Sequence, residues 1–244
     1  SDVYKRQVYD TSDEQYAQIR RSFEMIQEKS YKGIASKIKT EGGVVVFNPH
    51  SFDNSSVVSV GGGFIYVKDI PAKGYKVITP EKSNQQVVVT ESGMENAFFI
   101  IDFDESYNFS RIYDKKNNRE VLKAGEKGNT LLAFEDIPRG YDAWEITNYY
   151  TEKQWEINEV VSSEILMEGA RGGIKVTKKF LNSTIIQKIY IYHDIAKIDF
   201  DTTIDWKEEH ILVKTAFPVD IHTDKATYDC LLYTSPSPRD LSTS

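Results

Sequence analysis

From Val44 onward the sequence is a series of short runs of β-branched and aromatic residues separated by turn-forming residues. Such runs are typical of antiparallel strands, because β-branched and aromatic side chains fit a pleated sheet and Gly, Pro, Asn and Asp fit the turns between strands. No helical period interrupts the series. The pattern therefore predicts a mainly β protein from this point on.

The runs fall into two groups. Residues 41–92 contain short runs, from VVVF at 44–47 to QVVVT at 86–90, and predict a small antiparallel β domain. Residues 93–229 contain longer runs, with a hairpin turn expected at 115–118. Strands of roughly 8–12 residues without intervening helices predict a large antiparallel β-sandwich of two layers.

One helix precedes the strands. Thr11 and Ser12 are good N-cap residues, and the pattern predicts a helix from Thr11 to about Ile38 within a segment 8–40. Its apolar stripe recurs at spacings of three and four, with a serine among its members: Tyr16, Ile19, Phe23, Ile26, Ser30, Ile34 and Ile38. A stripe of this kind needs partner helices, and none follows. We therefore expect its partners to lie upstream.

The two ends of the chain are related at the level of DNA. One encoding of LLYTS at 231–235, read on the opposite strand one base out of frame, gives DVYK, the sequence at 2–5. Unrelated protein termini rarely share such a relation. We expect residues 1–7 and 230–244 to be translated sequencing adapter and exclude them from reasoning about the fold.

Composition limits the partners. The net charge of −7 and the lack of a basic stripe argue against nucleic-acid binding, which rests on Lys and Arg contacts to phosphates. No apolar run approaches the roughly 18–20 residues of a membrane span. The only cysteine is Cys230, so residues 8–229 contain no disulfide, which suits a reducing compartment. We expect a cytoplasmic protein.

Motifs for self-contained catalysis are missing from the sequence. The four histidines have no HxxxH or HxH spacing, and neither a GxSxG motif nor a phosphate-binding glycine loop is present. We therefore expect no metal site within this chain, and paired carboxylates remain the possible catalytic groups.

The stretch FEDIPRGYDAWEI at 134–146 concentrates acids and aromatics. Asp136, Asp142 and Glu145 are close enough in sequence to converge on one site, and glycoside hydrolysis needs paired carboxylates. The alternative is structural. Acids in a Pro/Gly loop often accept backbone N–H groups, and Tyr141 and Trp144 would then plug one end of the sandwich.

Seven blocks in order carry a resemblance to a known family: VVVFNPHS at 44–51, VKDIPAKGY at 67–75, MENAFF at 94–99, IYDKKNNREVL at 112–122, GNTLLAFEDIPRGYDAWEI at 128–146, TTIDWKEEHILVKTAFPVDI at 202–221 and ATYD at 226–229. Together they resemble the C-terminal half of glycoside hydrolase family 38, the α-mannosidases. The likeness is strongest to the bacterial and the cytosolic or vacuolar members, and we expect a bacterial source.

The resemblance implies a multi-domain parent enzyme with a catalytic α/β barrel, a three-helix bundle, a small β domain and a large sandwich. The family's zinc ligands and Asp nucleophile belong to the barrel and the start of the bundle, and no motif here matches them, so this chain would hold no catalytic residue. The helix within 8–40 would be the last helix of the three-helix bundle. The implied function is retaining, zinc-dependent hydrolysis of α-mannosides or mannose oligosaccharides. The missing barrel would be this fragment's partner, and the fragment alone would be inactive and bind no zinc.

One block resembles the family pattern EDxPxxWDAWD, from which the chain departs at Tyr141 and Glu145. The resemblance implies that this loop lies at the rim of the sugar pocket, where Asp142, Tyr141, Trp144 and Asp136 would bind substrate. A second block holds a few polar and aromatic residues that are also compatible with sandwich core and strand pairing: Asp205, Trp206 and His210.

Two other functions remain open. The parent could hydrolyse mannosylglycerate or a 6-phospho-mannosyl substrate, within the same family. Alternatively, the chain is a non-catalytic β-sandwich that binds carbohydrate or only braces a partner.

Overall fold

The computed structural model describes residues 2–79, 87–138, 140 and 146–223, with side chains from Val8 onward. The chain divides into two compact units, Ser1–Ser83 and Asn84–Ser244. Each unit is described by itself below. Over the described part of the chain, no helix combines the length and the apolar character needed to cross a bilayer.

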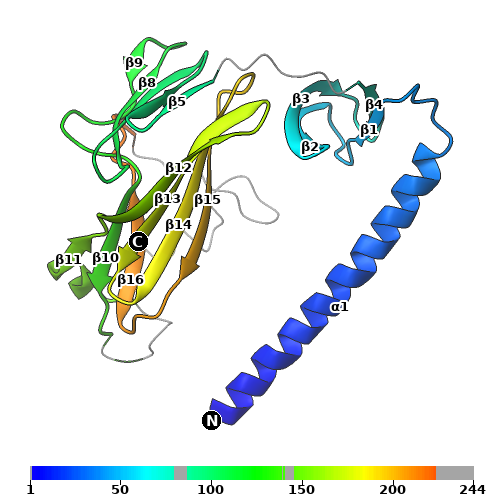
Figure 1. Cartoon of the computed structure of the whole chain (residues 1–244). Coiled ribbons are helices and arrows are strands. Elements are labelled where there is room, and N and C mark those ends of the chain that lie inside the picture. The colour runs from blue at the N-terminus through cyan, green and yellow to red at the C-terminus, as the bar shows by residue number, and fades with distance from the viewer. Residues whose placement is uncertain (1, 80–86, 139, 141–145, 224–244) are drawn as a thin grey trace. The chain divides into compact units, whose positions relative to one another are not determined.

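Over its described residues, the first unit contains one helix and four strands, which are drawn in Figure 1. They are α1 (Asp2–Ala35), β1 (Val44–Phe47), β2 (Asn54–Val60), β3 (Gly63–Ile70) and β4 (Tyr75–Ile78). The strands form two antiparallel pairs, β1 with β4 and β2 with β3. Gly61 and Gly62 make the turn between β2 and β3, with φ values of 60° and 85° in the left-handed region that favours glycine.

The predicted helix forms, but its predicted bounds are wrong. It begins at Asp2 rather than Thr11 and ends at Ala35 rather than Ile38. Thr11 and Ser12 therefore lie inside the helix and do not cap it. The segment before them contains no Pro or Gly to stop a helix, and the N-cap preference of Thr and Ser does not prevent them from occupying interior positions.

The apolar stripe of α1 is exposed within the described residues. Its members Ile19, Phe23 and Ile26 are 62–63% exposed. Near the other end of the helix, Tyr31 stacks on Phe47 of β1, with ring centroids 4.7 Å apart. A small core of Val46, Val67 and Ile70 joins the strands of this unit.

The second unit contains twelve strands and one short 3₁₀ helix over the described residues. They are β5 (Val88–Thr90), β6 (Gly93–Glu95), β7 (Phe99–Phe103), β8 (Phe109–Asp114), β9 (Arg119–Glu120), β10 (Thr130–Glu135), η1 (Asn148–Glu152), β11 (Gln154–Glu156), β12 (Glu159–Met167), β13 (Arg171–Phe180), β14 (Ser183–Tyr192), β15 (Ile198–Asp205) and β16 (Ile211–Ala216).

These strands form the expected sandwich. One layer is the antiparallel sheet β12-β13-β14-β15, and the other consists of the five-stranded sheet β5-β6-β7-β8-β9 and the three-stranded sheet β11-β10-β16 (Figure 1). The hairpin turn predicted at 115–118 is confirmed, since it joins the paired strands β8 and β9. The strand at 88–90, grouped above with the small β domain, instead pairs with β6 of this unit.

Two apolar clusters fill the space between the layers. The larger joins the five-stranded sheet to β13 and β14, and includes Ile101, Phe109, Ile174 and Ile189. The smaller joins the three-stranded sheet to β14: Leu131, Ala133, Ile157 and Ile185. Burial of these side chains is the main stabilising contribution to the sandwich.

Polar residues lie between the two clusters. Along β13, Val176 belongs to the larger cluster and Phe180 packs on the smaller, and the buried Lys178 comes between them. Its Nζ donates to Oδ1 of Asn108 at 3.1 Å. Gln187, on the neighbouring strand, accepts a hydrogen bond of 2.7 Å from Nδ2 of Asn129. We call Asn108, Asn129, Lys178 and Gln187 the polar seam.

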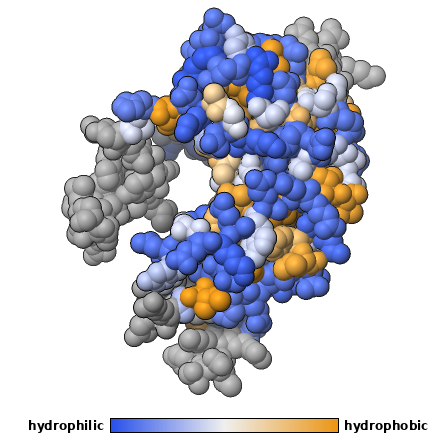
Figure 2. Space-filling view, turned by 90° about the vertical axis from the view of Figure 1, so that its left-hand side faces the viewer, coloured by the Kyte–Doolittle hydropathy of each residue, from blue (hydrophilic) through white to orange (hydrophobic). Residues whose placement is uncertain are grey.

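The surface seen in Figure 2 is largely hydrophilic, with apolar residues in small separate patches. Scattered apolar residues are ordinary on a protein surface.

Candidate functional site

The stretch 134–146 begins in the last two residues of β10. Phe134 lies on the outer face of the three-stranded sheet, where its ring meets the ring of Tyr150 at 5.2 Å. Nζ of Lys214, on β16, lies 3.9 Å from the centroid of the Tyr150 ring. Glu135 pairs with Lys153 at 2.6 Å. The start of the stretch is therefore fixed to both neighbouring strands.

Asp136 is the one predicted substrate-binding residue that the structure describes. Its backbone N–H donates to the carbonyl of His210 at 2.8 Å. Its Oδ1 is buried and has no hydrogen-bond partner among the described residues. A buried carboxylate oxygen is costly without a donor, so this atom is suited to accept one from a ligand or from a neighbouring segment.

The other three predicted substrate-binding residues, Tyr141, Asp142 and Trp144, lie outside the described residues, as does Glu145. Their role stays a prediction. The proximity of Asp136 to Asp142 that the sequence suggested is likewise untested.

The second block lies at the same end of the sandwich. Trp206 stacks on Phe180 with centroids 5.9 Å apart and planes 4° apart. Asp205 ends β15 and pairs with Lys207 at 3.1 Å. His210 is exposed, and its backbone carbonyl accepts the hydrogen bond from the N–H of Asp136. The contacts of Asp205 and Trp206 are those of strand pairing and core packing.

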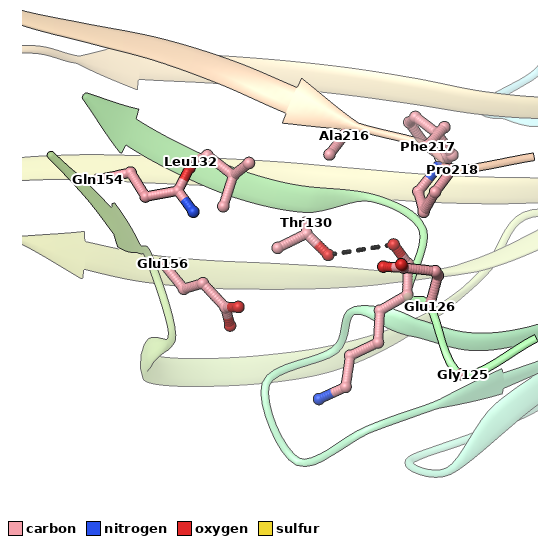
Figure 3. A pocket seen from close by; sticks show the side chains of 10 residues that line it. Gly125, Glu126, Thr130, Leu132, Gln154, Glu156, Ala216, Phe217 and Pro218 are labelled. Atoms are coloured by element: carbon pink, nitrogen blue, oxygen red, sulfur yellow. Dashed lines mark hydrogen bonds between the residues drawn. The ribbon is translucent and has the colours of Figure 1, made fainter. Parts of the chain in front are cut away.

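A pocket of about 560 Å³ opens on the outer face of the three-stranded sheet (Figure 3). Opposed residues of antiparallel strands share a face, and the register places Thr130 opposite Ala216 and Leu132 opposite Glu156. The pocket is lined by Gly125, Glu126, Lys127, Thr130, Leu132, Gln154, Glu156, Ala216, Phe217 and Pro218.

The pocket contains more acidic than basic side chains. Lys127 pairs with Asp104 at 2.7 Å, and this contact raises the pKa of Lys127. For Asp104, burial raises the pKa, but the hydrogen bonds from Lys127 and Asn108 prevail and lower it. Glu126 and Glu156 form no ion pair among the described residues, although Glu156 accepts a hydrogen bond of 2.8 Å from Asn158. The pocket is therefore acidic.

Neither this pocket nor the polar seam was predicted from the sequence. Their residues come from separate strands and loops, and become neighbours only through the register. The one available signal is the alternation of Thr130, Leu132 and Phe134 on β10, which places them on one face.

No metal centre forms in the described part of the chain. Over those residues, no group of three or more His, Cys, Asp or Glu side chains is placed to hold an ion. The described residues do not fit the zinc that the family resemblance implies.

Comparison with known proteins decides the family. The model of the "Glycosyl hydrolases family 38 C-terminal domain" matches residues 94–244, more than half of the chain. The chain belongs to glycoside hydrolase family 38. The match covers most of the second unit, including the pocket and the stretch 134–146.

Curated relatives of this family-38 chain carry α-mannosidase names. Alpha-mannosidase 2C1 from Homo sapiens is 25% identical over 66% of the chain, which corresponds to 17% of that protein. The protein of the same name from Mus musculus is 23% identical over 77% of the chain and 20% of its own length. Alpha-mannosidase G from Dictyostelium discoideum is 27% identical over 77% of the chain and 17% of its own length. The chain thus spans about a fifth of these relatives.

Proposed function

We propose that the chain is the C-terminal part of a retaining, zinc-dependent α-mannosidase that removes terminal α-mannosyl residues from mannose oligosaccharides. The observation that carries the proposal is the family-38 C-terminal domain match, together with relatives named as α-mannosidases. Zinc and the nucleophile would be held by the barrel of the parent protein, and no step of the reaction is assigned to the described residues. The setting would be the cytoplasm.

In this proposal the sandwich supplies a rim to the sugar site. The unpaired, buried Oδ1 of Asp136 supports this role, because a sugar hydroxyl is a suitable donor for it. The anchoring of Phe134 and Glu135 gives the start of the loop a fixed position. Precise placement of this kind is what substrate binding requires.

The test compares the chain with the parent protein extended upstream. The extended protein is expected to hydrolyse an aryl α-mannoside and release mannose with its anomeric configuration retained. The 244-residue chain is expected to show no turnover and no stoichiometric zinc. Zinc-dependent turnover by the chain alone would reject the proposed location of the catalytic groups.

Two alternatives have distinct outcomes in the same assay. A clear preference for the 6-phosphorylated aryl mannoside, or for mannosylglycerate, would favour the other hydrolases of the family. If the upstream sequence contains neither an HxD pair nor an Asp nucleophile, the chain is a non-catalytic sandwich that binds carbohydrate or braces a partner.

A further inference from the structure

The pocket on the outer face of the three-stranded sheet is built from residues that none of the comparisons assigns to a function. Its volume of about 560 Å³ lies within the range of about 300–1,000 Å³ that is usual for small-molecule sites. Its lining combines an apolar side with several polar groups. Both features are typical of a binding site.

The apolar side is formed by Leu132, Ala216, Phe217 and Pro218. Phe217 is 39% exposed, and its ring packs on Phe200 with centroids 5.5 Å apart. A partly exposed aromatic ring held by another ring offers a firm apolar surface to the C–H face of a sugar.

The polar side offers free hydrogen-bonding groups. Within the described chain, the side chains of Glu126 and Gln154 make no hydrogen bond to protein, and the contact from Asn158 uses only Oε2 of Glu156. Carboxylates accept hydrogen bonds and an amide both accepts and donates, so this set matches the hydroxyl groups of a sugar.

The charge of the pocket favours neutral over negatively charged sugars. Its lysine, Lys127, is already paired with Asp104, while Glu126 and Glu156 form no ion pair within the described residues. A phosphorylated or acidic sugar would meet like charge here. A neutral sugar fits better.

The position of the pocket relates it to the stretch 134–146. Thr130 lines the pocket and Asp136 follows the same strand, six residues later. At about 3.3 Å per residue this is a span of about 20 Å, comparable to a short oligosaccharide. Phe134 lies between them on the same face.

We propose that this pocket binds a neutral mannose residue of an oligosaccharide, away from the residue that is cleaved. The inference rests on the proposed function for the identity of the sugar. It goes beyond that function by adding a second contact for longer substrates.

The test is an NMR titration of the 244-residue chain with an α-linked mannotetraose. Saturating shifts are expected at the amides of Thr130, Gln154 and Ala216, with a dissociation constant of about 1 mM. Gln154→Leu and Glu126→Ala are each expected to weaken binding at least tenfold. Asp201→Asn, on the opposite layer, is the control and should leave binding unchanged.

Three results would overturn the inference: no saturating shifts at the pocket, shifts that persist in both pocket variants, or equal binding of mannose 6-phosphate or cellotetraose. The amide spectrum of each variant reports whether it is folded. Hydrolysis of an aryl mannoside by the extended protein does not involve this pocket. Loss of that hydrolysis with retained binding would therefore reject the proposed function and not the pocket.

Discussion

Nζ of Lys178 lies 3.1 Å from Oδ1 of Asn108 between the two apolar clusters of the sandwich. Both residues are buried, with 3% and 0% of their surfaces exposed. Burial lowers the pKa of Lys178 from 10.5 to about 8, although Asp104 and Glu156 favour its charged form. A lysine of this kind costs stability whenever it is charged.

Replacing Lys178 by Met should change how stability depends on pH. The unfolded chain holds this proton up to about pH 10.5 and the folded chain only to about 8, so stability rises with pH between the two values. Lys178→Met removes that rise. The free energy of unfolding of Lys178→Met minus that of the native protein should therefore decrease by about 2 kcal/mol from about pH 7 to about pH 9.5. Urea denaturation at the two pH values measures this difference.

Lys175→Met is the matched control. Lys175 lies on the same strand but is partly exposed and pairs with Glu164 at 3.1 Å. Its effect on stability should not change with pH by more than about 0.5 kcal/mol. Parallel pH curves for both variants would contradict the account of the buried lysine.

Gly173→Ala should disrupt the pairing of β13 with β14. A Cβ at this position would lie 2.0 Å from the carbonyl oxygen of Ile189 and 2.8 Å from Cδ1 of Tyr190. Because the nearest atom belongs to the neighbouring backbone, the strands must separate. A loss of about 3 kcal/mol or more is expected in thermal or urea unfolding.

Gly33→Ala is the contrasting substitution. No atom lies within 4 Å of a Cβ placed there, and the residue is in α1. Helix propensity then predicts a gain of up to about 1 kcal/mol. An equal loss in Gly33→Ala and Gly173→Ala would show that the clash is not the cause.

Asn48→Asp should destabilise the small β unit. Nδ2 of Asn48 donates to the carbonyls of Phe52 at 2.8 Å and Ile70 at 3.0 Å, and Oδ1 accepts from the N–H of His50. Aspartate keeps the acceptor but removes the donors. A local loss of about 1–3 kcal/mol is expected, read from hydrogen exchange of the β1–β4 amides. Asn54→Asp is the control and should leave exchange nearly unchanged.

The sequence predicted those features that depend on local pattern. Alternating runs predicted the strands, and the 115–118 turn was predicted from residues that favour turns. The start of α1 was wrong because Thr11 suits both a cap and a helix interior.

Features that depend on which strands pair, and in which register, could not be predicted from the sequence. The placement of β5 in the second unit is decided by its hydrogen bonds to β6, which its composition does not reveal. The seam contact of Lys178 with Asn108 joins residues 70 positions apart. For the site, the sequence singled out Asp136 but not Gln154, since only the register brings Gln154 beside Phe134.

Asp142→Ala in the extended protein tests the proposed rim. If Asp142 contacts the sugar, kcat/KM for an aryl α-mannoside should fall at least tenfold, about 1.4 kcal/mol of transition-state stabilisation, with the melting temperature nearly unchanged. Asp201→Ala, an exposed aspartate on β15, is the control and should retain full activity. A lower melting temperature without loss of kcat/KM would mean that the loop only braces the sandwich, because a structural role alters folding and leaves the chemistry intact.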